Sequence, residues 1–179
     1  MRVLAILGRG AAVALAIAVT GCASSDASFG ERQELANMPA RLMVPATRPA
    51  TLIGTFSKHC LETPSDNAAR TALLRASDYV PMGGWSGGTR RFVVADLRPM
   101  VILSETGRTC AVQAAARSGQ TNAIAAEIAR TWPQARPLAP SAAYEAAWET
   151  APGQAEVVAL LRNPRGPGQN EITLALMRR

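Results

Sequence analysis

The chain has 179 residues, of which 48% are hydrophobic and 18% are charged, with a formal net charge of +6 at pH 7. Its arginines are scattered, and aromatic residues make up only 4% of the chain, whereas nucleic-acid binding needs clustered basic residues with aromatics between them. Composition therefore argues against nucleic acid as a partner.

The first 21 residues have the features of an export signal. Arg2 and Arg9 give a positive start, and residues 10–19 are uncharged and mainly aliphatic. This order is typical of a secretory signal peptide, and the run is shorter than the about 20 residues that a membrane-spanning helix needs. We therefore expect residues 1–21 to be removed.

The run ends in Val19-Thr20-Gly21-Cys22, which resembles the lipobox of bacterial lipoproteins. The resemblance implies cleavage before Cys22 and acylation of Cys22, and several acyl chains together anchor a protein durably. Ala23, where aspartate would mark inner-membrane retention, implies transport to the outer membrane, with the domain on the periplasmic face. The alternative is an ordinary signal peptide, or a retained N-terminal helix, with an incidental cysteine.

Residues 22–50 are predicted to be the lipidated N-terminus and a tether. They contain Pro39, Pro45 and Pro49 and show no sustained periodicity, apart from a short helical turn across residues 31–38. Residues 51–179 are long enough for one domain with its own core. The predicted organisation is thus signal peptide, tether and a single periplasmic domain.

Two helices are predicted in this domain. Asp66 provides an N-cap for residues 67–77, and apolar residues follow at helical spacing. Thr121 is the expected cap of the second helix, residues 122–132, which Pro133 ends.

Six strands are expected, at residues 91–96, 100–104, 109–114, 143–149, 156–162 and 171–177. The sequence shows no internal repeat. The predicted class is α+β: an antiparallel sheet of about five to six strands with two helices packed on one face. This outline loosely resembles small exported proteobacterial proteins of unknown function, and it implies no activity.

Cys60 and Cys110 remain once Cys22 is assigned to the anchor. An even pair of cysteines in an oxidising compartment predicts a disulfide bond. Two separate buried thiols are the alternative.

Catalytic and metal sites have little support in the sequence. His59 is the only histidine and precedes Cys60 directly, but neighbours in sequence point in different directions and rarely form a nucleophile pair. Cys-x-x-Cys and zinc-ligand spacing are missing, and Glu145 and Glu149 are expected to be solvated charges. We expect no catalytic residue, no metal and no cofactor.

A glycine-rich segment follows the first helix. Glycines on both sides of a tryptophan allow it to be displayed to a glycan or a protein, unless it folds back onto the core. Two arginines beside it would add an anion-facing patch. The candidate contact residues are Gly83, Gly84, Trp85, Gly87, Gly88, Arg90 and Arg91.

The sequence thus predicts an outer-membrane lipoprotein that binds or assembles with another envelope component without catalysis. The alternatives are a small periplasmic enzyme, such as a hydrolase, and a glycan-binding module.

Overall fold

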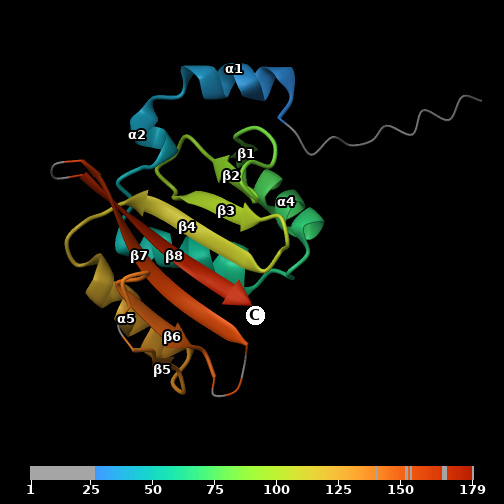
Figure 1. Cartoon of the computed structure of the whole chain (residues 1–179). Coiled ribbons are helices and arrows are strands. Elements are labelled where there is room, and N and C mark those ends of the chain that lie inside the picture. Colours follow the sequence, from blue (N-terminus) through green and yellow to red (C-terminus); the bar gives the residue numbers. More distant parts are fainter. Residues whose placement is uncertain (1–26, 140, 152, 154, 167–168, 179) are drawn as a thin grey trace, which may run out of the picture.

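The computed structural model describes residues 27–139, 141–151, 153, 155–166 and 169–178, so the predicted lipidation site, Cys22, lies outside the described residues. Its helices are α1 (Phe29–Asn37), α2 (Ala40–Met43), α3 (Pro49–Phe56), the π-helical turn η1 (Ser57–Leu61), α4 (Asn67–Arg75) and α5 (Gln120–Thr131) (Figure 1). None of them is both long and apolar enough to cross a bilayer.

Eight strands form one antiparallel sheet in the order β1-β2-β3-β4-β8-β7-β6-β5. Their bounds are β1 (Val80–Pro81), β2 (Thr89–Val93), β3 (Met100–Ser104), β4 (Thr109–Ala115), β5 (Arg136–Pro137), β6 (Ala146–Glu149), β7 (Glu156–Gly166) and β8 (Gln169–Arg178). The last strands of two successive meanders, β4 and β8, therefore pair at the centre of the sheet.

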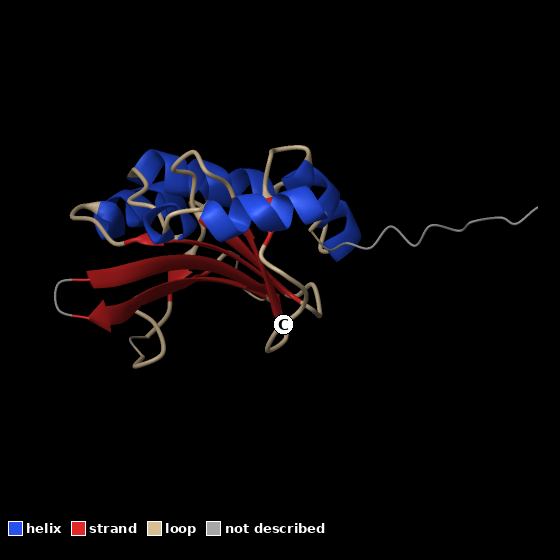
Figure 2. Ribbon diagram, turned by 90° about the horizontal axis from the view of Figure 1, so that it is seen from above, coloured by secondary structure: helices blue, strands red, loops and turns tan. Residues whose placement is uncertain are grey.

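The helices lie on one side of the sheet (Figure 2). The predicted α+β class with an antiparallel sheet is confirmed, but the sheet has eight strands instead of five to six. The two extra strands, β1 and β5, are two residues long and lie at the edges, so they are too short to leave an alternating pattern. The described chain also contains five α-helices instead of two.

The hydrophobic core fills the space between the helices and the sheet. In β8, Ile172, Leu174 and Leu176 face the helices and are fully buried, as the alternation in this strand predicts. From the helix layer, α3 contributes Leu52 and Phe56 to the same core.

The two predicted helices differ in how they begin. The Asp66 carboxylate accepts a hydrogen bond from the Ala69 amide at 2.8 Å, so the predicted cap of α4 is confirmed. Helix α5 begins earlier than expected, after Gly119 with φ 82°, and the Thr121 hydroxyl donates to Glu145. Thr121 as the cap is therefore wrong, because the turn at Gly119 starts the helix before it.

The stretch predicted as a tether makes defined contacts with the domain. The carbonyl of Pro45 accepts a hydrogen bond from the Ala115 amide of β4 at 2.9 Å. The hydroxyl of Thr47 donates to the Leu97 carbonyl at 2.8 Å, and Glu31 of α1 pairs with Arg75 of α4. Ordered contacts thus begin well before residue 51.

Candidate functional site

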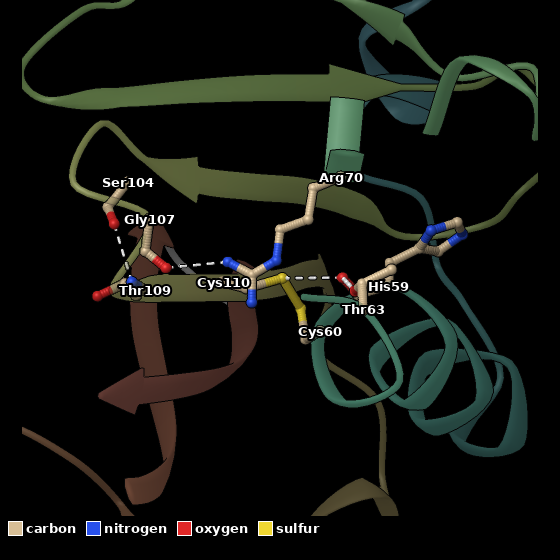
Figure 3. The surroundings of a disulfide bond; sticks show 8 residues. All are labelled: His59, Cys60, Thr63, Arg70, Ser104, Gly107, Thr109 and Cys110. Carbon is tan, nitrogen blue, oxygen red and sulfur yellow. Dashed lines mark hydrogen bonds between the residues drawn. A yellow bond between two sulfur atoms is a disulfide. The ribbon is translucent and has the colours of Figure 1, made fainter. Parts of the chain in front are cut away.

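The disulfide bond predicted between Cys60 and Cys110 is present, with the two Cα atoms 5.4 Å apart (Figure 3). Both cysteines are fully buried, Cys60 in η1 and Cys110 in the central strand β4. The bond closes a loop across 50 positions of the sequence. It ties the helix layer to the middle of the sheet, so its role in the described structure is to hold two layers together.

His59 points into the protein interior beside this disulfide. It is 3% exposed, and its ring makes a T-shaped contact with the Tyr79 ring, with the two ring centres 5.5 Å apart. Burial, followed by the charges of Lys58 and Arg98, lowers the pKa of His59 from 6.5 to about 4. The imidazole is therefore neutral at pH 7.

The backbone of His59 also contacts the disulfide. Its carbonyl oxygen lies 3.5 Å from Cys110 Sγ, as the dashed line in Figure 3 marks, and accepts a hydrogen bond from the Thr63 hydroxyl. The oxidised sulfur has no proton to donate, so the first of these is a packing contact. With Cys60 in the disulfide, no thiolate is available for His59 to activate.

Arg70 is a buried charge that no sequence pattern predicted. Its Nη1 donates to the Gly107 carbonyl at 3.0 Å, in the turn between β3 and β4 (Figure 3). Burial and the nearby charge of Arg178 lower its pKa. Arg70 and Leu74 are one helical turn apart on the buried face of α4, a place where sequence patterns predict an apolar residue.

The described residues contain no group of three histidine, cysteine, aspartate or glutamate side chains that could hold a metal ion. Glu145 is engaged elsewhere: its carboxylate accepts a hydrogen bond from Arg162 at 2.7 Å, and this contact holds the pKa of Glu145 below its usual value.

The glycine-rich segment forms an ordered hairpin, which we call the glycine hairpin (residues 82–91). Ser86 and Thr89 exchange backbone hydrogen bonds at 2.8 and 3.1 Å around Gly87 and Gly88. Both glycines have positive φ, 57° and 72°, as a two-residue type I′ turn requires. The Glu105 amide donates to the Gly88 carbonyl, which fastens the tip to the neighbouring β3–β4 turn.

Trp85 lies directly before this turn and is 37% exposed. Its side chain is thus partly exposed to solvent and is not a buried core residue. Arg91 is also exposed, and it lines a hollow with Met82 and Gly84.

Arg90 points the other way. It is 1% exposed, and its guanidinium lies 5.5 Å from the centre of the Phe92 ring. Successive residues of a strand face opposite sides of a sheet, so Arg90 faces the core and Arg91 faces solvent. The predicted patch of two adjacent arginines is therefore wrong, and only Arg91 belongs to the outer surface.

The sheet face away from the helices has a different character. The residues in register across its centre are mostly small: Ala147, Ala159, Ala175 and Ala111. Beside this row, buried Glu171 accepts a hydrogen bond from Gln113 at 2.9 Å and pairs with Arg165. Large exposed apolar side chains are found instead at Phe29, Leu73, Trp85 and Leu97, all in the first half of the described chain.

No protein-family model matches this chain, and no curated protein or solved structure matches it either.

Proposed function

We propose that the chain is a lipid-anchored component of the bacterial cell envelope that binds another envelope protein through the glycine hairpin. One observation carries the proposal. Trp85 is held exposed at the tip of a hydrogen-bonded hairpin, whereas His59, Cys60 and Cys110, the residues with the greatest chemical reactivity, pack inside the domain.

Export is supported by the disulfide between Cys60 and Cys110, because such bonds persist in oxidising compartments and are rare in the reducing cytosol. The anchor is supported by the lipobox-like residues 19–22, and Ala23 favours the outer membrane. Together they support a periplasmic domain attached through acylated Cys22.

A non-catalytic role is supported by the state of His59. A general base needs a pKa near the working pH and access to a substrate. The pKa of His59 is about 4 and its side chain is buried against Tyr79, so it meets neither condition.

Binding at the glycine hairpin is supported by the residue types on its surface. Tryptophan and arginine are enriched among the residues that contribute most to protein interfaces. Trp85 and Arg91 are both exposed there, and the type I′ turn fixes the backbone that presents them. A preorganised surface loses less conformational entropy on binding than a mobile loop does.

Photo-crosslinking in intact cells tests this proposal. A photoreactive amino acid at Gly84, which is exposed beside Trp85, should give adducts with one or a few envelope proteins. Trp85→Ala should abolish these adducts, and the same photoreactive residue at exposed Ala142 on the far edge of the sheet is the matched control. Equal adducts from both positions would contradict the proposal.

Two further measurements separate the parts of the proposal. Palmitate labelling should be lost in Cys22→Ala, and labelling that persists would remove the anchor. Retention of the protein on isolated cell-wall glycan in a manner that depends on Trp85, without protein adducts, would assign the glycine hairpin to a glycan instead.

A further inference from the structure

The end of the molecule that carries α1 is where the chain arrives from the proposed anchor. The first described residue is Ala27, five positions after Cys22. Five residues of fully extended chain span at most about 18 Å, whatever their conformation. A domain of this size is about 40 Å across, from its expected radius of gyration of about 15 Å.

The link from Cys22 to Ala27 is therefore shorter than half the width of the domain. It holds the α1 end near the membrane and the opposite end away from it. Figure 1 shows α1 beyond the β1 side of the sheet, with β5 and β6 at the other end, in agreement with the strand order.

One face of α1 is turned toward the domain. Glu31 pairs with Arg75 of α4, and Glu34 and Met38 line a groove with Val80 of β1. With 3.6 residues per turn, these positions fall on the same side of the helix. Glu31 thus points toward the domain, and the exposed side chain of Glu34 lies beside the groove.

The opposite face, which we call the outer face of α1, consists of Phe29, Arg32, Gln33 and Ala36, all exposed. Phe29 is 69% exposed, the highest value among the large apolar side chains of the described residues. The Arg32 guanidinium lies 6.0 Å from the centre of the Phe29 ring. The outer face therefore combines an aromatic ring with a cation and contains no carboxylate.

We infer that the outer face of α1 lies on the phospholipid surface, with Phe29 among the headgroups and Arg32 against anionic phosphates. Aromatic rings favour the membrane interface, and a basic residue near an anionic membrane gains about 1 kcal/mol. The inference rests on the proposed anchor at Cys22. It also places the β1 edge, from which the glycine hairpin extends, close to the membrane.

Site-specific fluorescence tests this orientation. The full chain is purified with its lipid and reconstituted into vesicles of phosphatidylethanolamine and phosphatidylglycerol that contain a phospholipid with a nitroxide headgroup. A polarity-sensitive dye is attached to Phe29→Cys, Ala36→Cys or Ala142→Cys, one variant at a time. The dye reacts only with the new thiol, because Cys60 and Cys110 are joined in a disulfide and Cys22 carries its lipid.

Dyes at positions 29 and 36 should be quenched several-fold more strongly than the dye at position 142, with emission shifted to shorter wavelength. Position 36 is the sharper probe: it lies 14 positions from Cys22 along the chain, so its quenching requires α1 to lie along the surface. Arg32→Glu should weaken the quenching at position 36, whereas Arg136→Glu, the same charge change on β5, should not.

A wrong orientation of α1 and a missing lipid anchor give different experimental results. If the protein floats with the vesicles but positions 29 and 36 are quenched no more than position 142, the orientation is overturned and the anchor stands. If the protein does not float and incorporates no palmitate, the anchor itself fails, and the orientation fails with it.

Discussion

In the first half of the molecule, α3 precedes the meander β1 to β4, and in the second half, α5 precedes the meander β5 to β8. The two helices pack against each other on one side of the sheet, and the two meanders join through β4 and β8. The order of elements is thus repeated, although the sequence contains no repeat.

The two halves are stabilised differently. In the second half, β7 and β8 are 11 and 10 residues long. Carboxylates pair with arginines in both halves, for example Glu31 with Arg75 and Glu156 with Arg178. In the first half the longest strand has seven residues, and a disulfide joins its helix layer to β4. The disulfide thus lies in the half with the shorter strands.

The largest expected effect is the loss of this bond. The double variant Cys60→Ala/Cys110→Ala should lower the free energy of unfolding by about 2–5 kcal/mol, because a native disulfide restricts the unfolded chain. Urea unfolding measures the loss, with the reduced wild-type protein as the control.

Amide hydrogen exchange tests whether the disulfide stabilises the first half more than the second. In the double variant, amides of α3 and η1 should exchange faster than before, whereas those of β7 and β8 should change less. Equal acceleration in both halves would show that the disulfide stabilises the whole sheet and not its first half.

The next effect depends on pH. The pKa of His59 is lowered from 6.5 to about 4 by burial, so below pH 6.5 the unfolded chain binds a proton that the folded protein does not bind. Stability should therefore fall by about 3 kcal/mol between pH 6.5 and pH 4 because of this one group.

His59→Phe keeps an aromatic ring beside Tyr79 but cannot titrate. Unfolding measured in both proteins from pH 7 to pH 4 should show a flatter profile for the variant, since carboxylates affect both alike. Parallel profiles would mean that His59 is protonated as readily in the folded state as in the unfolded chain.

A smaller effect is expected at the turn between β3 and β4. Gly107 has φ 71°, and a Cβ there would clash with the carbonyl of Ser65. Gly107→Ala should lower the free energy of unfolding by about 2–3 kcal/mol, which thermal unfolding detects. Gly83, with φ 76° and open space around it, is the matched control, and Gly83→Ala should cost only about 1 kcal/mol.

The smallest effect belongs to the second half. Glu145→Gln removes the ion pair with Arg162 at the partly exposed end of β7 and should cost about 0.5 kcal/mol. Chemical unfolding at low and high salt checks this value, because the wild-type advantage should shrink with salt. A loss as large as that of the disulfide variant would invert the comparison between the halves.

Much of the fold follows from local patterns in the sequence. The helix after Asp66 and the alternation of Ile172, Leu174 and Leu176 are visible there, because a cap and a period of two are local signals. Helix α3 was missed, although Leu52, Phe56 and Cys60 recur every four residues. These three residues lie on two consecutive elements, because Leu52 and Phe56 belong to α3 and Cys60 belongs to η1. The pattern therefore did not mark the bounds of one helix.

The candidate site was predictable only in part. Glycines around Trp85 indicated a hairpin, but whether Trp85 turns inward or outward depends on contacts with distant residues such as Glu105. The opposite orientations of Arg90 and Arg91 depend on the start of β2 and on which face of the sheet the helices cover.

By itself the sequence determined the secondary structure around strong local signals, because a helix cap or an alternating strand depends on neighbouring residues. It also predicted the disulfide, because two cysteines remain once Cys22 is assigned to the expected anchor. Tertiary structure alone decided the burial of His59 and Arg70, the exposure of Trp85 and the outer face of α1. Each of these depends on which segments pack together, and a side chain's surroundings are supplied by residues far away in the chain.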